Sequence, residues 1–351
     1  MILPATMKFG LYFGSSDVRI GERPIPAIGP TEVLVRVATC GICGSDTMEW
    51  YREPAIRRLG GINTGHEIAG EIVATGERVS RFQPGDRVVV VHHFPCMECM
   101  PCRDGNETAC EAMREKHIEP GGFSQYIRVL EPCVAKGLYL LPDTMTFEQG
   151  SFVEPLACVV RGMRKVAPVA ERTVLVLGSG LAGLLHIKLA RHLGARRITA
   201  VDTNPRRLEA ASRAGADDGI SPAEKLPSAD RVFVCTGSPQ AAEGALDSVN
   251  RGGQILFFAT DGPDKSLPIP LTRFWTMQPT ISFSYGAAPR DMQEAIELLR
   301  AGQVSVDDLV THRLGIDQIA EAFQIASNPR DSSLKVLVEP NRDGQWLGIS
   351  S

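Results

Sequence analysis

A glycine-rich turn constrains the fold of this chain more than any other feature of its sequence. The turn, residues 178–183 (GSGLAG), follows a short apolar run at 173–177 and opens a helical pattern over 181–193. Glycines at a strand-to-helix turn let the backbone approach a pyrophosphate, whose charge is stabilised at the helix N-terminus. The turn therefore predicts a dinucleotide-binding fold, and the residues predicted to contact the cofactor are Gly178, Gly180, Leu181 and Gly183.

The segments after this turn alternate between apolar strands and helical patterns. Strands are expected at 197–201, 231–234 and 253–258, and helices at 205–214 and 239–250. Strand and helix in alternation predict an α/β domain with a parallel, doubly wound sheet.

An aspartate directly after the predicted strand at 197–201 indicates which cofactor is bound. Asp202 stands where an acidic side chain accepts hydrogen bonds from the adenosine ribose hydroxyls. A carboxylate there repels a 2'-phosphate, so the sequence favours NAD over NADP. Arg206 and Arg207 follow closely and complicate that choice; Arg207 is a further candidate for cofactor contact, and a solvated helix face is the alternative.

The chain before about residue 141 contains short β-type runs broken by glycine and proline. The clearest runs are 33–38, 68–74, 87–91 and 123–129. This pattern predicts a mostly β domain.

The end of the chain is expected to return to that β-rich domain. An amphipathic helix with apolar residues at i, i+3, i+4 and i+7 begins at Met292, a second helix lies near 317–327, and a β run follows at 334–338. A chain of 351 residues is long for a single core, so two domains are expected. The predicted boundaries are 1–152 with 289–351 for the β-rich domain, and 153–288 for the α/β domain.

Four cysteines in one loop-like stretch predict a closed metal site. Thiolates two residues apart in a loop can reach one tetrahedral zinc ion, and four of them saturate it, so the site would be structural. Disulfides or unlinked thiols are the alternative, but nine cysteines without a secretory signal favour metal binding in a reducing compartment. The residues are Cys96, Cys99, Cys102 and Cys110.

A second set of zinc-type residues, Cys43 with His66 and Glu67, predicts an open metal site. Fewer protein ligands leave a position for water or substrate, as in catalytic zinc sites. Spacing alone is weak evidence when ligands come from distant loops. Taken singly, His66 also fits a hydrogen-bonded structural histidine, and the same is true of His92 and His93.

Composition excludes several other classes of protein. The 37 basic and 41 acidic residues give a formal charge of -4, and no long basic run offers a surface for nucleic acid. No apolar stretch approaches the length needed to span a membrane, and the N-terminus lacks the pattern of a secretory signal. A cytoplasmic protein is expected, without nucleic-acid or membrane partners.

Several motifs, in order along nearly the whole chain, resemble the zinc-dependent medium-chain dehydrogenases, and most closely their sorbitol (polyol) and threonine dehydrogenase branch. The motifs are Gly41-Ile42-Cys43-Gly44-Ser45-Asp46, Gly65-His66-Glu67, Pro84-Gly85-Asp86-Arg87-Val88, the four-cysteine stretch and Glu154-Pro155-Leu156. The resemblance implies a GroES-like β-rich catalytic domain built from both ends of the chain, and a central Rossmann domain.

The resemblance also implies the ligands of a catalytic zinc. Cys43 and His66 would bind the metal, and Glu67 and Glu154 are the remaining candidates, one binding directly and the other through water. Asp46 would hold His66 by its other ring nitrogen, although a helix N-cap role is equally compatible.

Further roles come from the resemblance alone. Ser45 matches the hydroxyl residue that begins proton removal, but Met48 stands where many relatives carry a histidine, which leaves the outer proton route open. Thr236 would lie near the nicotinamide, with a simple strand-end turn as the alternative. Lys335 would match a basic residue that meets the pyrophosphate.

The function expected from this resemblance is oxidation of a secondary alcohol of a polyol, sugar or cyclitol to its ketone, or the reverse, by hydride transfer to or from NAD. The cofactors would be catalytic and structural Zn²⁺ and NAD, the partner a small alcohol or ketone, and the assembly a homodimer or homotetramer. A threonine-type amino-alcohol dehydrogenase and a non-catalytic nucleotide-binding relative are the alternatives.

Overall fold

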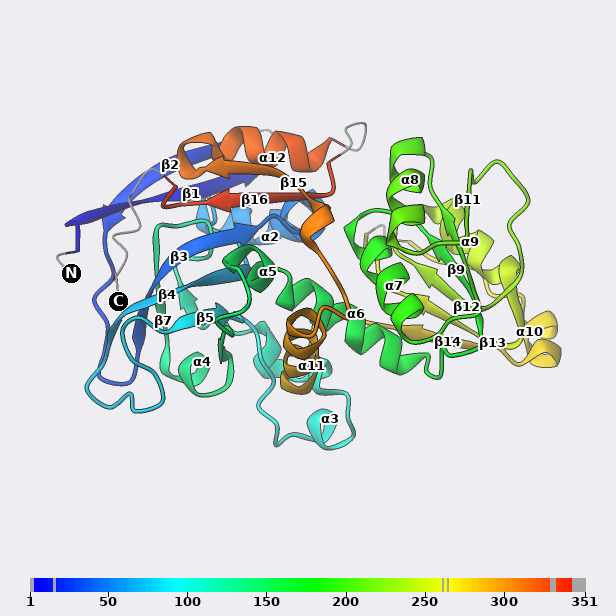
Figure 1. The fold of residues 1–351 in the computed structure, drawn as a ribbon, viewed down its shortest axis with the longest axis horizontal. Helices are drawn as coiled ribbons and strands as arrows, with labels where there is room; N and C mark the ends of the chain where they lie inside the picture. The colour runs from blue at the N-terminus through cyan, green and yellow to red at the C-terminus, as the bar shows by residue number, and fades with distance from the viewer. Residues whose placement is uncertain (1–2, 15–16, 261, 264, 329–332, 343–351) are drawn as a thin grey trace. The chain divides into compact units, whose positions relative to one another are not determined.

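The computed structural model describes residues 3–14, 17–260, 262–263, 265–328 and 333–342. It divides the chain into two compact units, the first formed by Met1–Glu154 with Val306–Ser351 and the second by Pro155–Ser305. Each unit has its own main β-sheet (Figure 1).

The first unit is β-rich, as predicted. Its main sheet runs in the order β15-β16-β3-β4-β5-β8, with β7 pairing with both β3 and β6, and a separate antiparallel pair is formed by β1 and β2. The strands are β1 (Thr6–Gly14), β2 (Asp17–Pro24), β3 (Val33–Gly41), β4 (Glu67–Thr75), β5 (Arg87–Val90), β6 (Ile118–Glu119), β7 (Tyr126–Val129), β8 (Leu138–Leu140), β15 (Val310–Gly315) and β16 (Lys335–Glu339).

Short helices connect these strands. The α-helices of the first unit are α1 (Gly44–Thr47), α2 (Glu49–Leu59), α3 (Met100–Arg103), α4 (Glu131–Lys136), α5 (Phe147–Ser151) and α12 (Ile319–Ser327), and 3-10 turns cover Glu107–Ala109, Glu111–Arg114, Asp307–Leu309 and Ile316–Gln318.

Strand β3 is the centre of this sheet. It is a nearly continuous apolar run with Val33, Val35 and Val37 fully buried, as expected for a strand that is covered on both faces. The last strand in the described part of the chain, β16, pairs antiparallel with it, with Leu337 opposite Gly41. Strand β16 therefore adds to the main sheet of the first unit.

The second unit contains a six-stranded parallel sheet in the order β11-β10-β9-β12-β13-β14. The order reverses next to β9, the strand that carries the glycine-rich turn. The strands are β9 (Thr173–Leu177), β10 (Arg197–Val201), β11 (Asp218–Ile220), β12 (Ala229–Val234), β13 (Val249–Phe257) and β14 (Thr280–Phe283).

Helices alternate with most of the strands of this sheet, and α6 precedes the first of them. Because crossovers between parallel strands are right-handed, the helices after β9 and after β12 cover opposite faces of the sheet. This is the predicted doubly wound α/β architecture. The helices are α6 (Val153–Lys165), α7 (Leu181–His192), α8 (Pro205–Ala214), α9 (Pro239–Ser248), α10 (Leu271–Met277) and α11 (Pro289–Arg300).

One predicted boundary is displaced. The sequence placed 289–351 in the β-rich domain, whereas residues up to Ser305, with helix α11, belong to the second unit. The reason is a buried ion cluster between two helices, in which Asp291 of α11 accepts from Arg161 (3.4 Å) and Arg164 of α6. A buried carboxylate requires such partners, so α11 packs with α6.

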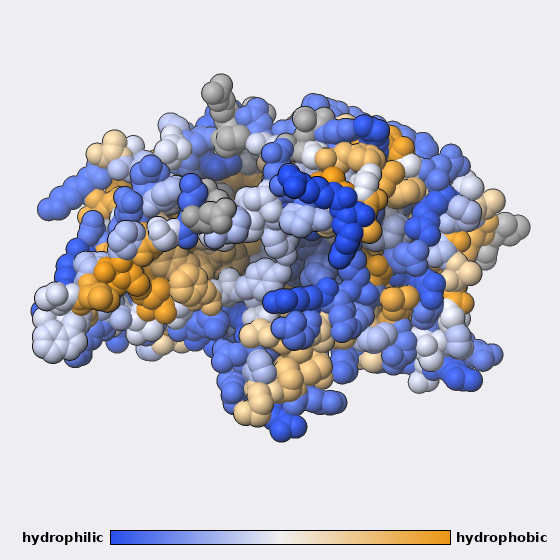
Figure 2. Space-filling model, turned by 180° about the vertical axis from the view of Figure 1, so that it is seen from behind, coloured by the Kyte–Doolittle hydropathy of each residue, from blue (hydrophilic) through white to orange (hydrophobic). Residues whose placement is uncertain are grey.

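The surface is predominantly hydrophilic on the face shown in Figure 2, with separate apolar patches. Several large apolar side chains of the second unit are exposed near the edge strand β14, among them Trp275 at 80% and Phe283 at 70%. Along the described chain, no helix combines the length and apolar character required to cross a membrane.

Candidate functional site

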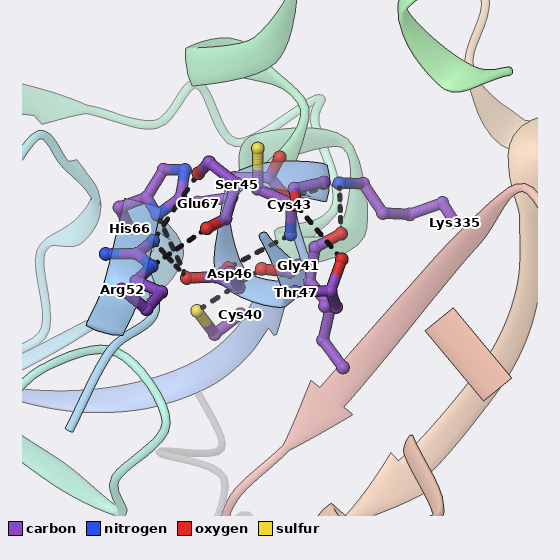
Figure 3. A network of polar contacts seen from close by, with 12 residues as sticks. Cys40, Gly41, Cys43, Ser45, Asp46, Thr47, Arg52, His66, Glu67 and Lys335 are labelled. Carbon is purple, nitrogen blue, oxygen red and sulfur yellow. Dashed lines mark hydrogen bonds and ion pairs between the residues drawn. The ribbon is translucent and has the colours of Figure 1, made fainter. Parts of the chain in front are cut away.

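The antiparallel pairing of β3 with β4 brings Cys43, His66 and Glu67 together. Cys43 follows β3 and is the N-cap of α1, whereas Glu67 is the first residue of β4 and His66 immediately precedes it. Because Gly41 is paired with Glu67, the loop after β3 and the start of β4 occupy the same end of the sheet. One ligand atom from each of the three residues lies within 4.8 Å of the others (Figure 3).

Glu67 has one carboxylate oxygen without a protein partner. Its Oε2 forms an ion pair with Lys335, whereas its Oε1 is buried and has no hydrogen-bond partner among the described residues. Leaving a buried acceptor unsatisfied costs about 1–3 kcal/mol, which a cation would offset. A thiolate, an imidazole and a carboxylate oxygen form a donor set that zinc accepts, so the residues present fit this metal.

Asp46 makes the surroundings of His66 negative. Its Oδ1 lies 3.6 Å from Nδ1 of His66, and its Oδ2 accepts the backbone N–H of Cys43 at 3.1 Å. Burial alone would lower the pKa of His66, but the charges of Asp46 and Cys43 outweigh burial and hold that pKa well above its usual value. A proton on His66 offsets this negative charge in part, and a divalent cation would offset it more fully.

Glu154, the second candidate carboxylate, lies in the first turn of α6. Its charge contributes to the raised pKa of His66, so it lies within electrostatic reach of the site. Among the described residues, however, the group with ligand atoms within 4.8 Å of one another contains Glu67 and not Glu154. The structure therefore brings Glu67 directly to Cys43 and His66, and Glu154 less closely.

Lys335 lies in a different place from the one predicted. It begins β16 and is fully buried, with Nζ paired to Glu67 and donating to the carbonyl oxygen of Ile42 at 3.2 Å. An ammonium group enclosed in this way is not available to a cofactor phosphate. The predicted pyrophosphate contact is therefore replaced by a buried ion pair at the metal site, because β16 pairs with β3 and carries Lys335 to this end of the sheet.

Ser45 lies on α1 beside Arg52, a partly buried arginine of α2 that no motif in the sequence pointed to. Its backbone carbonyl oxygen accepts from Nε of Arg52 at 2.8 Å, and its Oγ lies 3.4 Å from Nη2 of the same residue. Met48 connects α1 to α2, and its thioether cannot carry a proton.

His92 lies closer to the site than the sequence indicated. Its ring centroid is 5.0 Å from that of His66, and the ring of His93 is 3.6 Å from that of His92. Burial, together with the neighbouring cationic groups, lowers the pKa of His92 well below its usual value, so its imidazole is neutral. The only sequence signal for this placement is that His92 directly follows the predicted strand at 87–91.

The four cysteines of the loop converge, as expected for a closed metal site. Their sulfur atoms all lie within 4.8 Å of one another, with 3.4 Å between Cys99 and Cys102. Backbone N–H groups of Glu98 and Cys99 donate to the sulfur of Cys96 and lower its pKa, which favours the thiolate that binds metal. The cysteines, with Met113 and Ala112, are the apolar cluster of this loop, so a metal ion would hold together a segment with little other core.

Replacement of Cys99 by serine is expected to remove the metal of this loop and to lower the melting temperature, because three thiolates hold zinc less tightly than four. Zinc content per chain should fall by one, measured by elemental analysis alongside thermal unfolding. Met100→Ser is the matched control, since Met100 is a neighbouring residue with an exposed side chain outside the sulfur cluster. Unchanged zinc content in the Cys99 variant would rule out this structural metal.

The glycine-rich turn has the geometry that a nucleotide loop requires. Gly178 directly follows β9 and has a φ of 94°, a region that favours glycine, and Gly180 is the N-cap of α7. A Cβ on Gly183 would collide with the carbonyl oxygen of Gly178, whereas a Cβ on Gly180 would meet nothing within 4 Å. The backbone at Gly180 and Leu181 is thus open to a ligand at the N-terminus of α7.

Asp202 is already oriented toward this turn. Its Oδ2 accepts the backbone N–H of Ser179 and its Oδ1 that of Asn204, each at 2.8 Å.

The two other predicted cofactor contacts lie on neighbouring elements of the same unit. Thr236 lies just after β12, and its Cβ is the heavy atom nearest to the position that a Cβ on Gly178 would occupy. Arg207 lies in the first turn of α8, and its Nε is buried without a hydrogen-bond partner in the described part of the chain.

Two stretches of the chain match known protein families, and similar proteins cover nearly its whole length. Residues 29–143 match the alcohol dehydrogenase GroES-like domain, and residues 182–301 match the zinc-binding dehydrogenase domain. Sorbitol dehydrogenase of Bacillus subtilis is 31% identical over 97% of this chain and 99% of its own length. L-arabinitol 4-dehydrogenase of Aureobasidium melanogenum is 30% identical over 94% of this chain and 92% of its own length. The crystal structure of 2R,3R-butanediol dehydrogenase from Bacillus subtilis superimposes with a TM-score of 0.82 at 28% identity, over 95% of this chain and 100% of that one.

Proposed function

This chain belongs to the zinc-dependent medium-chain dehydrogenases, in their polyol branch, and we propose that it interconverts a secondary alcohol of a polyol, sugar or cyclitol with its ketone, using NAD(H). The observation that carries the proposal is the group of Cys43, His66 and Glu67, which offers a metal fewer ligands than the four-cysteine loop does. Such a site leaves room for a substrate oxygen.

Zinc held by Cys43, His66 and a carboxylate would supply Lewis-acid polarisation of the substrate hydroxyl, and NAD would accept the hydride. Asp46 keeps His66 oriented from its Nδ1 side, 3.6 Å away. Ser45, two residues beyond Cys43, receives the proton of the substrate hydroxyl as it releases its own. Because Met48 offers no proton acceptor, Ser45 passes the proton on to water.

The carboxylate ligand is either Glu67 or Glu154. The unpartnered Oε1 of Glu67 favours that residue, since it already lies beside Cys43 and His66. Glu154 would then act through water. Even so, the charge of Glu154 contributes to the raised pKa of His66 and so favours a cation there.

The cofactor is NAD, bound at the N-terminus of α7 with Gly178, Gly180, Leu181 and Gly183 lining the pyrophosphate. The orientation of Asp202 toward the turn supports this choice, since its carboxylate would face the ribose hydroxyls and repel a 2'-phosphate. Arg207 and Thr236 contact the cofactor at the adenosine and nicotinamide ends, respectively.

A panel of polyols, sugars, cyclitols and amino alcohols, assayed by NADH absorbance, tests this function. We expect the largest kcat/KM for a secondary alcohol of a polyol-type substrate with NAD, because an open zinc site polarises a hydroxyl and Asp202 excludes the 2'-phosphate. The same panel run with NADP is the control for cofactor choice. A clear preference for NADP would refute the role of Asp202, and preference for threonine would support the amino-alcohol alternative.

Metal content separates the enzyme from a non-catalytic nucleotide-binding relative. The enzyme should hold zinc at both the open group and the four-cysteine loop, whereas a relative that only binds nucleotide should hold zinc at the loop alone. Retention of Cys43, His66, Glu67 and Glu154 in this chain supports the enzyme.

We further propose that the protein acts in the cytoplasm as a homodimer or homotetramer. Exposed apolar side chains near the edge strand β14, Trp275 and Phe283 among them, support self-association. An exposed edge strand with such side chains is a natural site for pairing with a second copy.

A further inference from the structure

Arg52 contacts both Ser45 and Asp46, two residues beside the metal group, through one guanidinium group. Its Nε donates to the carbonyl oxygen of Ser45 at 2.8 Å, and its Nη2 donates to Oδ1 of Asp46 at 2.8 Å and lies 3.4 Å from Oγ of Ser45 (Figure 3). Arg52 belongs to α2, so these contacts hold the α1 segment from outside it.

The carboxylate that Arg52 contacts is the one that faces His66. Asp46 is completely buried, and its Oδ1 lies between the guanidinium and Nδ1 of His66, which is 3.6 Å away. A buried carboxylate without a cation is strongly disfavoured and would turn away or take up a proton. The guanidinium of Arg52 therefore offsets the charge of Asp46 and holds its carboxylate in place beside His66.

Both buried carboxylates at this site are paired with a cation of their own. Asp46 is paired with Arg52 and Glu67 with Lys335, and neither acid is more than 1% exposed. The cations differ in what they can do, because only a guanidinium can hold two acceptors in a fixed planar arrangement. Arg52 uses this property to connect Asp46 with Ser45.

We propose that Arg52 is a positioning residue of the active site, which acts through Asp46 on the zinc ligand His66 and acts directly on Ser45, the residue that receives the substrate proton. This inference rests on the proposed function. Arg52 is no proton acceptor, since a guanidinium stays protonated in proteins, so it does not replace the histidine that relatives carry at the position of Met48. It fixes the geometry of the first proton transfer and leaves the later transfer to water.

Two substitutions of Arg52 test this role, each compared with a control on the same helix. Arg52→Met removes the charge and all three contacts, and Arg52→Lys keeps a charge that can reach Asp46 but cannot hold Ser45 at the same time. Arg57→Met is the control, because Arg57 is exposed on α2 and pairs with Glu53. Zinc release to a chromogenic chelator is measured first, and kcat and KM for the best polyol afterwards.

We expect Arg52→Met to release zinc from the open site about 10- to 100-fold faster than the wild type, since loss of a residue that orients a ligand typically weakens metal sites by that factor. The value of kcat should fall by a similar factor, with KM for NAD unchanged. Arg52→Lys should retain zinc nearly as well as the wild type but show reduced kcat. Arg57→Met should match the wild type in every measurement.

Combination with Asp46→Asn identifies the route by which Arg52 acts. If Arg52 acts on His66 through Asp46, the effects of Arg52→Met and Asp46→Asn on zinc release should be less than additive. Additive effects of the two substitutions would overturn the proposal, and so would zinc release at the wild-type rate in Arg52→Met. If Arg52→Met does not fold, an unchanged kcat in Arg52→Lys would overturn it. A wild-type protein without zinc at the open site, or without polyol turnover, would instead refute the proposed function.

Discussion

Replacement of Cys43 by serine is expected to reduce dehydrogenase turnover by about a thousandfold or more and to leave the fold intact. Cys43 supplies the thiolate of the open metal group, and zinc typically contributes several kcal/mol to such a reaction, at 1.36 kcal/mol for each tenfold change in rate. Serine has nearly the same shape but is a poor zinc ligand at neutral pH. Turnover, zinc content and thermal unfolding should be measured on the same preparation.

The control for this substitution is another cysteine of the same unit. Cys133 is fully buried, and its thiol donates to the carbonyl oxygen of Val91 at 3.2 Å, a bond that a serine hydroxyl can also make. Cys133→Ser should therefore keep its turnover. NADH binding, followed by fluorescence, should be equal in both variants. If Cys43→Ser kept turnover within tenfold of the wild type, the open group would not be the active site.

The central strands and helices of the α/β unit could be predicted because their local signals agree with one another, whereas the outer strands β11 and β14 were not predicted. The strands 173–177 and 197–201 and the helix 205–214 have the predicted bounds. Helix α8 illustrates the reason. Asn204 caps its N-terminus and Gly215 ends it in a left-handed conformation, so residue types that favour helix ends mark both of its limits. The start of β13 at Val249 was missed, because Arg251-Gly252-Gly253 has the composition of a turn.

The residues of the open metal site could be predicted from the order of their motifs, but not from spacing. The chain separates Cys43 from His66 by the whole of α2, and what brings them together is the register of β3 against β4, with Gly41 opposite Glu67. Sequence patterns predict that two strands exist more readily than how they are paired. The resemblance to a known family supplied that missing information.

Contacts between distant residues explain what the sequence did not indicate. Lys335 and Glu67 lie at opposite ends of the chain, and only the pairing of β16 with β3 brings them together. Arg52 has a simpler signal, since it lies six residues beyond Asp46, but an arginine in a charged helix ordinarily faces solvent. Both residues became identifiable only through the buried carboxylates that they neutralise.

Replacement of Lys335 by methionine is expected to lower the free energy of unfolding by about 3–5 kcal/mol, because it leaves the carboxylate of Glu67 buried without a cation. Methionine keeps most of the volume of the lysine side chain, so little of the loss should come from packing. The measurement is urea denaturation of metal-depleted protein. A smaller loss is expected with zinc bound, since Oε1 of Glu67 lies beside Cys43 and His66 and a cation there would offset its charge.

Two further variants show whether charge is the cause of this loss. Glu67→Gln combined with Lys335→Met removes both charges and should recover most of the stability, since a neutral pair has no uncompensated charge to bury. Lys8→Met breaks the exposed ion pair with Asp317 and should change stability by less than about 1 kcal/mol. If the double variant were as unstable as Lys335→Met alone, the loss would come from packing around Lys335, and Glu67 would need no cation to remain buried at the metal site.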